Sequence, residues 1–158
     1  MPKLLTVDDE PDVLYITRRI LEDEGFSVTG VTSGDECLKR VKEDKPDVIL
    51  LDVRMPGIDG WEVCKKLKED DETKSIPVVM FTVMSEDIYK TKSFEYAHAD
   101  WHVPKPFETE DLLDVVRIAT KSKSEIEKEI NEILQKEERR KEVLKMLNPK
   151  LMAHKYDF

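Results

Sequence analysis

Short apolar runs alternate along the first 120 residues with longer stretches in which apolar positions recur at helical spacing. The apolar runs lie at 3–7, 26–31, 48–53, 77–82 and, more weakly, around 101–103. Segments at 13–21, 36–41, 61–67, 88–97 and 112–118 carry apolar residues three or four positions apart. Strands that alternate with helices are typical of a parallel sheet covered by helices on both faces. We therefore predict an α/β domain of five βα units that ends near residue 120.

The composition changes after residue 120. Residues 121–151 contain no glycine and are dominated by strong helix formers. We expect a charged helical extension at 121–158, formed mainly by one long helix that Pro149 ends or kinks, with a frayed end at 153–158.

Apolar residues of this extension recur at heptad spacing and continue the register of the segment at 112–118. One cluster is Ile126, Ile130 and Ile133, and another is Leu144, Leu147 and Leu151. Charged Glu137 and Arg140 lie between the two clusters, which weakens a continuous seam. Three arrangements stay open: a coiled coil that joins two chains into a homodimer, a helix folded back on the domain, and a solvated helix with an apolar stripe.

Charge and length narrow the possible partners. The formal charge is −9, with 27 acidic and 16 basic residues at 1–120 against 8 acidic and 10 basic residues at 121–158. An acidic body disfavours nucleic-acid binding, because phosphate contacts need clustered basic side chains. The sequence shows neither a signal peptide nor an apolar stretch long enough to cross a membrane, so we expect a cytoplasmic protein. Cys37 and Cys64 are expected to be small buried thiols rather than a disulfide.

Polar side chains follow four of the predicted strands. The first strand ends in Asp8, Asp9 and Glu10, the third in Asp52 and the fourth in Thr82, and the fifth is followed by Lys105-Pro106. The carboxyl ends of the strands in a doubly wound sheet share one rim, where ligands bind.

Carboxylates that lie so close together repel one another, and this raises the pKa of at least one of them unless a cation is present. Carboxylate oxygens with room for water suit Mg²⁺, and Lys105 adds a second positive charge. Such an arrangement resembles a phosphoryl-transfer site. A simpler interpretation is also open, in which Asp8-Asp9-Glu10 caps a helix and Met55-Pro56-Gly57 forms an ordinary turn.

The set of motifs resembles the receiver domain of two-component response regulators. The resemblance covers residues 1–120 and depends on Asp8-Asp9, on the run DVRMPGIDG at 52–60, on Thr82 and on Lys105-Pro106-Phe107, all in order. It implies a flavodoxin-like sheet with strand order 2-1-3-4-5. It also implies that Asp52 is the phosphoacceptor, which takes a phosphoryl group from a phosphohistidine of a sensor histidine kinase or a phosphotransfer protein.

The resemblance implies roles for the neighbouring residues as well. Asp9 and Asp52 would bind Mg²⁺ together with the backbone carbonyl of Arg54, and Asp8 would act mostly through water. Lys105 and Thr82 would contact the phosphoryl oxygens. An aspartate nucleophile gives a labile acyl phosphate, whose negative charge a lysine and Mg²⁺ offset.

Four positions either depart from the family pattern or affect how fast the phosphoryl group is lost. His102 stands where the family has a Tyr or Phe that swings inward when the threonine shifts, so it is either the switch residue or an exposed histidine without that role. Val83 replaces a small residue next to the phosphoryl group and is expected to narrow access to Asp52. Arg54 and Met84 occupy positions that tune how water reaches the acyl phosphate, and we expect them to prolong its lifetime.

The resemblance also bears on the output. The extension lacks a helix-turn-helix pattern or a basic face, so we expect a stand-alone receiver that contacts a downstream protein through its fourth helix, fifth strand and fifth helix. We expect no enzymatic activity beyond its own phosphorylation and dephosphorylation. A Mg²⁺-dependent phosphatase is disfavoured because Arg54 stands where such enzymes usually have a second acid. A phosphorylation-independent scaffold stays open as an alternative. His98, His102 and His154 lack metal-ligand spacing, and no zinc site is predicted.

Overall fold

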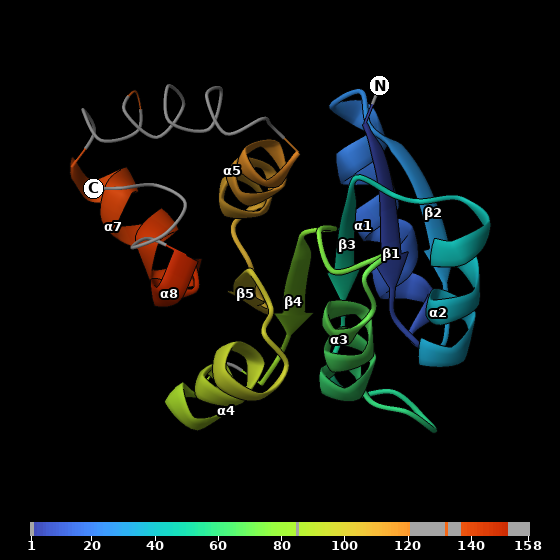
Figure 1. Ribbon diagram of the computed structural model, residues 1–158. Coiled ribbons are helices and arrows are strands. Elements are labelled where there is room, and N and C mark those ends of the chain that lie inside the picture. Colours follow the sequence, from blue (N-terminus) through green and yellow to red (C-terminus); the bar gives the residue numbers. More distant parts are fainter. Residues whose placement is uncertain (1, 85, 121–131, 133–136, 152–158) are drawn as a thin grey trace.

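The computed structural model describes residues 2–84, 86–120, 132 and 137–151, and it confirms the predicted fold class. In this part of the chain five strands form one parallel sheet in the order β2-β1-β3-β4-β5 (Figure 1). The strands are β1 (Lys3–Val7), β2 (Ser27–Val31), β3 (Val48–Leu51), β4 (Val78–Thr82) and β5 (Trp101–Pro104).

Helices cover both faces of the sheet. The helices of the domain are α1 (Pro11–Asp23), α2 (Gly34–Glu43), α3 (Gly60–Glu69), α4 (Asp87–Thr91), the π-helix η1 (Lys92–Tyr96) and α5 (Thr109–Ala119). Buried residues of α1 and α5 belong to the hydrophobic cluster on one face of the sheet, whereas buried residues of α2 and α3 belong to the cluster on the other face. The sheet is therefore buried on both sides, as the apolar runs predict.

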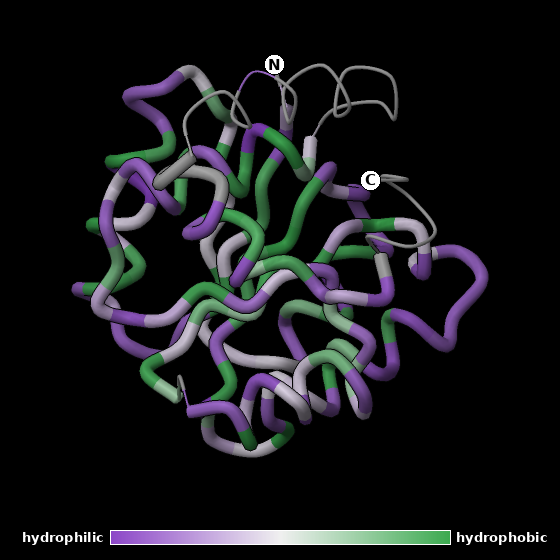
Figure 2. Tube along the Cα trace, turned by 90° about the vertical axis from the view of Figure 1, so that its left-hand side faces the viewer, coloured by the Kyte–Doolittle hydropathy of each residue, from purple (hydrophilic) through white to green (hydrophobic). Residues whose placement is uncertain are grey.

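Adjacent residues in a strand point to opposite faces, and here both faces are apolar. Leu4 and Leu50 lie in the cluster with α1 and α5, whereas Leu5 and Ile49 lie in the cluster with α2 and α3. Figure 2 shows the hydrophobic positions gathered along the central strands. This double burial explains why the strands read as continuous apolar runs rather than as an alternating pattern.

Local side-chain bonds start two of the helices. Ser33 accepts a hydrogen bond from the Glu36 amide at the start of α2, and Asp59 accepts one from the Glu62 amide at the start of α3. Helix α1 begins at Pro11, and the side chain of the preceding Glu10 makes no capping bond. Asp8 and Asp9 therefore lie before the helix, and the interpretation of this acidic run as a simple helix cap explains neither of them.

The predicted helical segment at 88–97 contains an irregularity. Helix α4 passes into η1, where the Ala97 amide bonds to the Lys92 carbonyl, five residues earlier. His98 then adopts a φ of 61°, in the left-handed region, and ends the helix. The wider turn places the side chain of Ser93 in the interior of the domain.

The described part of the C-terminal extension folds back on the domain. Helix α5 ends at Ala119, and α7 (Glu137–Met146) contacts α5 and β5 before α8 (Pro149–Leu151) begins (Figure 1). Whether the extension is formed mainly by one long helix stays a prediction, because residues 121–131 and 133–136 lie outside the described part of the chain. The expected interruption near Pro149 is confirmed, since α7 ends at Met146 and α8 begins at Pro149.

The packing of α7 shows which of the three predicted arrangements one part of the C-terminal extension adopts. Val143, Met146 and Leu147 are buried in the same cluster as α5, and Leu144 packs against that cluster. The fold-back arrangement is therefore confirmed for this segment. The apolar cluster at 126–133 and the end at 153–158 lie outside the described residues.

The two cysteines are free and buried, as expected. Burial raises the pKa of the Cys37 thiol to about 12 and raises the pKa of Cys64 as well. Thiols with such pKa values stay protonated near neutral pH and are poor nucleophiles.

Candidate phosphoryl-transfer and metal site

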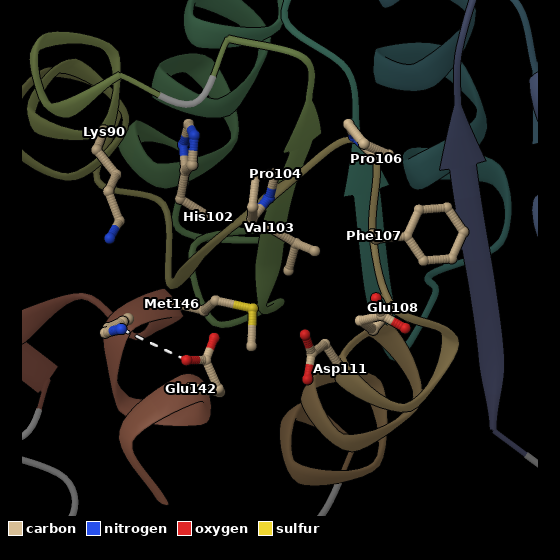
Figure 3. Close-up of a pocket in the computed structure, with 11 residues that line it drawn as sticks. Lys90, His102, Val103, Pro104, Pro106, Phe107, Glu108, Asp111, Glu142 and Met146 are labelled. Atoms are coloured by element: carbon tan, nitrogen blue, oxygen red, sulfur yellow. Dashed lines mark hydrogen bonds and ion pairs between the residues drawn. The ribbon is translucent and has the colours of Figure 1, made fainter. Parts of the chain in front are cut away.

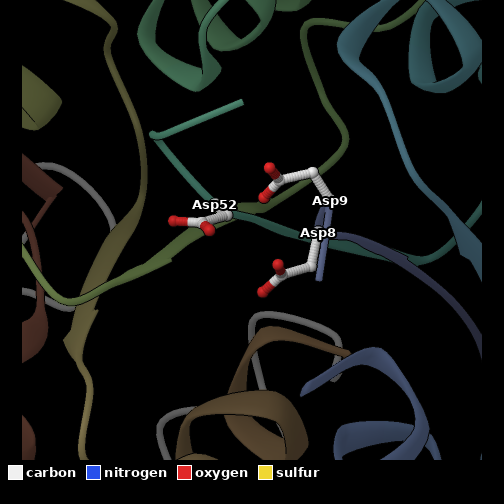
Figure 4. A group of neighbouring side chains, drawn as sticks. All are labelled: Asp8, Asp9 and Asp52. Atoms are coloured by element: carbon white, nitrogen blue, oxygen red, sulfur yellow. The ribbon is translucent and has the colours of Figure 1, made fainter. Parts of the chain in front are cut away.

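Three carboxylates from two neighbouring strands meet at one edge of the sheet. Asp8 and Asp9 follow β1, and Asp52 follows β3, which lies beside β1. One oxygen of each side chain lies within 4.8 Å of an oxygen of the other two (Figure 4). Asp8 and Asp52 are buried, and Asp9 is more accessible to solvent than either of them. The structure thus brings together the acidic residues that the sequence places at the rim.

Backbone bonds fix the positions of two of these carboxylates. The Asp8 amide bonds to the Val31 carbonyl of β2 at 3.2 Å, and the Asp52 amide bonds to the Val7 carbonyl of β1 at 3.0 Å. Each aspartate therefore continues the sheet register by one residue, just past the end of its strand.

The glycine at the start of α3 allows the chain to close tightly around Asp52. A Cβ atom on Gly60 would lie 2.0 Å from the backbone oxygen of Asp52, which no side chain tolerates without a backbone shift. The Gly60 amide bonds to the Val53 carbonyl at 2.9 Å. Position 60 therefore requires glycine for a steric reason, which accounts for the last residue of the 52–60 motif.

Lys105 brings a positive charge to the acidic cluster. The Lys105 amide bonds to the Thr82 carbonyl at 2.8 Å and is followed by a cis peptide bond to Pro106. Its Nζ lies 2.5 Å from Asp8 Oδ2 and 3.7 Å from Asp52 Oδ2. The lysine therefore lies within reach of both buried carboxylates.

The electrostatic balance at Asp52 follows from these contacts. Burial raises the pKa of Asp52, and the negative charge of Asp8 acts in the same direction. The charge of Lys105 and hydrogen bonds from Thr82 and the Val53 amide favour the ionised form but do not outweigh burial. The carboxylate repulsion that the sequence predicts therefore acts on Asp52, and a further cation would favour its ionised, nucleophilic form.

Thr82 and Val83 lie at the end of β4 in different environments. The Thr82 side chain is fully buried, hydrogen-bonds to Asp52 and accepts a bond from the Met84 amide at 3.2 Å. The Val83 side chain is 60% exposed. The expectation that Val83 narrows access to Asp52 stays a prediction.

Arg54 and Met84 face an open hollow beside the acidic cluster. The Arg54 residue is exposed and Met84 is half-buried. The hollow is also lined by Asp9 and Trp61. Arg54, in the connection after β3, and Met84, in the connection after β4, therefore line the same hollow as Asp9.

His102 is buried, so the alternative of an exposed histidine is wrong. Its side chain is 1% exposed, and burial lowers the pKa of His102 to about 4. Nε2 lies 2.9 Å from the Met84 carbonyl oxygen, and Nδ1 lies 2.8 Å from Ser93 Oγ. A carbonyl only accepts, so Nε2 carries the proton of the neutral ring and Nδ1 accepts a bond from the Ser93 hydroxyl.

Ser93 and Trp61 extend this contact into a chain of hydrogen bonds. The Trp61 indole Nε1 donates to Ser93 Oγ at 2.9 Å, and the Ser93 hydroxyl donates to His102. His102 donates to the Met84 carbonyl, and the Met84 amide donates to Thr82. The chain links α3 to the threonine beside Asp52. Sequence reasoning missed both Ser93 and Trp61, because a serine in an amphipathic helix carries no signal that it points inward.

The acidic cluster fits a hard divalent cation. It offers carboxylate oxygens, in Asp9 a more accessible side chain that leaves room for water, and a depth at which an uncompensated carboxylate is unfavourable. Mg²⁺ usually binds through one or two carboxylates and keeps several waters, and the set Asp8, Asp9 and Asp52 meets that requirement.

Among the described residues, no helix is long and apolar enough to cross a membrane.

Comparison with known proteins gives the same picture of the domain. The family model of the response regulator receiver domain matches residues 4–117. The phosphate regulon transcriptional regulatory protein PhoB of Rhizobium meliloti is 36% identical over 117 residues, which make up 74% of this chain and 51% of PhoB. The chain thus spans about half the length of this relative.

Solved structures share the fold at similar identity. A putative response regulator from Chloroflexus aurantiacus is 34% identical with a TM-score of 0.72, and the match covers 75% of this chain and 97% of that chain. The response regulator TrrA from Thermotoga maritima, solved in complex with Mg²⁺-BeF, is 29% identical with a TM-score of 0.68, over 75% of this chain and 99% of that chain. With the matched family model covering most of its length, the chain belongs to the response regulator receiver domain family.

Proposed function

We propose that this chain is a Mg²⁺-dependent receiver in which Asp52 accepts a phosphoryl group from a phosphohistidine of a sensor histidine kinase or a phosphotransfer protein. The observation that carries the proposal is the meeting of Asp52 with Asp8, Asp9, Thr82 and Lys105 at one edge of the sheet. Membership of the receiver family supports it.

The two oxygens of Asp52 have different surroundings. Oδ1 accepts a hydrogen bond from the Val53 amide at 2.8 Å, and Oδ2 lies toward Lys105. We assign Oδ2 as the nucleophile: it forms the new bond to phosphorus while the phosphorus–nitrogen bond of the donor breaks, and the electron pair leaves with the imidazole. Lys105 and Thr82 then contact the phosphoryl oxygens, and Val83 lies beside them at the strand end.

The metal site of the proposal is formed by Asp8, Asp9, Asp52 and the backbone carbonyl of Arg54. A bound Mg²⁺ would supply positive charge that offsets repulsion between the carboxylates and the incoming phosphoryl group. The Mg²⁺ in the similar TrrA structure supports this assignment. Lys105 already neutralises part of the cluster through Asp8, which leaves Asp9 as the accessible ligand.

Thr82 and His102 form the proposed switch. Thr82 hydrogen-bonds to Asp52 and also accepts from Met84, whose carbonyl accepts from His102. A shift of Thr82 toward a phosphoryl group would move the Met84 backbone, which is bonded to Thr82. This movement would change the hydrogen bond between His102 and the Met84 carbonyl. Unlike a Tyr or Phe that swings in, His102 is already inside the domain, so the change would be a rearrangement of hydrogen bonds rather than an inward rotation.

Arg54 and Met84 are proposed to slow hydrolysis of the acyl phosphate by crowding the water that attacks it. They line the same hollow beside the acidic cluster. We expect the double variant Arg54→Ala, Met84→Ala to lose its phosphoryl group at least several-fold faster, measured as the decay of phosphoprotein after the donor is removed. An unchanged decay rate would exclude the crowding role.

The partners follow from this chemistry. Output would pass to a downstream protein through altered protein contacts, in the cytoplasm, without catalysis beyond the receiver's own phosphorylation and dephosphorylation. PhoB is named as a transcriptional regulator, but only its receiver part matches this chain, so DNA binding is not transferred. Pairing of two chains through the tail is not part of the proposal, because the described apolar residues of α7 are buried in their own domain.

Incubation with acetyl phosphate and Mg²⁺, followed by intact mass, tests the proposal. The chain should gain one phosphoryl group, and Asp52→Asn should gain none. Asp35→Asn removes an exposed carboxylate from α2 and serves as the matched control that still gains the group. No gain in the unaltered chain, or an equal gain in Asp52→Asn, would overturn the assignment.

A further inference from the structure

Helix α7 occupies a defined face of the receiver domain. It contacts β5 and α5, and the chain returns to this place after leaving the end of α5 (Figure 1). Val143, Met146 and Leu147 are buried and join the cluster that contains Trp101 and Leu112. Removal of these apolar side chains from water stabilises the contact between α7 and the domain.

Backbone contacts strengthen the apolar ones. Leu147 forms an antiparallel bridge with Trp101 of β5, which is an edge strand of the sheet. The Asn148 amide bonds to the Asp100 carbonyl at 3.0 Å, and its side-chain Nδ2 bonds to the Ala99 carbonyl at 3.0 Å. The segment after α7 therefore satisfies backbone groups beside β5 that would otherwise be open to another chain.

The domain to which α7 binds is complete without it. The family model ends at residue 117, and the structure from Chloroflexus aurantiacus matches over 97% of its own length with only 75% of this chain. Helix α7 thus packs on a domain whose fold does not require it.

The fit of α7 is incomplete on the side of α4. A cavity of about 370 Å³ lies between α7 and the domain, with Phe107 and Met146 among its apolar walls and Lys90, Asp111 and Glu142 among its charged residues (Figure 3). Protein interiors are close-packed, so a space of this size shows that α7 fills only part of the face. A partner could therefore make contacts here that α7 does not make.

The charges favour a basic occupant. Residues 137–151 contain five basic and three acidic residues, whereas residues 1–120 contain 16 basic and 27 acidic ones. Lys150 pairs with Glu95 of η1 at 2.7 Å. An amphipathic helix with a basic polar face complements this domain better than a neutral or acidic one.

We propose that α7 is an internal competitor, which covers the face of β5 and α5 and so controls access of the downstream protein to the face through which the family resemblance already implies that it docks. The partner would present a basic amphipathic helix with apolar residues at positions i, i+3 and i+4 and an asparagine at i+5, as Val143, Met146, Leu147 and Asn148 do. The identity of this surface as the output site rests on the proposed signalling function, but its occupancy is tested without phosphorylation.

A labelled peptide of residues 137–151 is the probe. The double variant Val143→Asp, Leu147→Asp releases α7 of the full chain but leaves the face itself unaltered, so the peptide should bind it at least ten-fold more tightly than it binds the unaltered chain, by fluorescence anisotropy. Lys141→Arg changes an exposed residue of the same helix and keeps its positive charge, so this variant should bind the peptide as weakly as the unaltered chain. A peptide that carries Leu147→Asp should bind none of them.

Two results would overturn the proposal: equal peptide affinity for the double variant and the unaltered chain, or equal affinity of the altered and unaltered peptides. If the double variant does not unfold cooperatively, Asn148→Ala removes the side-chain bond to Ala99 with the apolar contacts intact. This milder variant should bind the peptide several-fold more tightly than the unaltered chain, and no change would count against the competitor role. Failure of phosphorylation at Asp52 would leave these binding results intact, so the two proposals fail separately.

Discussion

At the scale of single residues, Asp52 and His102 are a buried acid and a buried base, and burial shifts each of them toward its neutral form. Burial raises the pKa of Asp52 and lowers the pKa of His102 to about 4. Because of this shift, the ionised form of Asp52 needs positive charge nearby, and Lys105 supplies only part of that charge. For His102 the shift fixes a neutral ring that donates to Met84 and accepts from Ser93.

The pH dependence of stability tests the state of His102. Its pKa is about 6.5 in the unfolded chain and about 4 in the folded one. As the pH falls through this window the unfolded chain binds a proton that the folded chain does not, so the free energy of unfolding falls, by about 3 kcal/mol at pH 4. Above the window this residue makes no pH-dependent contribution. His102→Phe should lack this loss, as measured by urea unfolding between pH 7 and pH 4.

His98→Asn is the matched control for that experiment. His98 is exposed, and asparagine tolerates its left-handed backbone, so the control should keep the pH dependence of the unaltered chain. Carboxylates that titrate in the same range are common to all three proteins and cancel in the comparison. Identical slopes for the unaltered chain and His102→Phe would show that His102 binds a proton as readily in the folded chain as in the unfolded one.

At the scale of elements, the sequence predicted what depends on local pattern and missed what depends on contact. The five strands were predictable because both faces of the sheet are apolar, and the acidic edge was predictable because Asp8, Asp9 and Asp52 each follow a strand. The inward position of Ser93 was not, because it depends on the π-turn of η1. The fold-back of α7 was one of three open arrangements, because heptad spacing does not distinguish a partner helix from the chain's own domain.

A buried ion pair ties three elements together at the opposite edge of the sheet. Lys68 of α3 lies 2.8 Å from Asp100, whose Oδ2 also accepts from the Val78 amide of β4 at 2.9 Å. Lys68→Met removes one partner of a buried pair and should lower the free energy of unfolding by about 3 kcal/mol in urea titrations. Lys74→Met removes an exposed lysine paired with Asp71 and should change it by about 0.5 kcal/mol or less. Similar losses in both variants would mean that the buried pair does not join these elements.

At the scale of the whole molecule, we expect negative charge and the acidic edge to make stability depend on a divalent cation. The formal charge is −9, and the acidic groups include Asp8, Asp9 and Asp52, whose carboxylate oxygens lie within 4.8 Å of one another. A ligand that binds only the folded chain stabilises it by mass action. The sequence indicated a divalent cation through the carboxylates that follow the predicted strands, and the fold shows that Asp8 and Asp52 among them are buried.

Mg²⁺ is therefore expected to raise the melting temperature. At a free concentration ten times its dissociation constant, Mg²⁺ should add about 1.4 kcal/mol to the free energy of unfolding, and a chelator should remove this gain. Asp9→Asn, which alters the more accessible ligand, should lose most of the gain, whereas Asp35→Asn should keep it. Sodium chloride at matched ionic strength separates binding from screening. An equal gain in Asp9→Asn would place the cation elsewhere.

Chemical trapping of the acyl phosphate tests the central claim most directly. After treatment with acetyl phosphate and Mg²⁺, reduction with borohydride converts an aspartyl phosphate to homoserine, which peptide mass mapping locates in the sequence. We expect homoserine at position 52, only when both Mg²⁺ and the donor are present. Homoserine at another aspartate, or an unmodified Asp52 in a chain that has gained a phosphoryl group, would contradict the account.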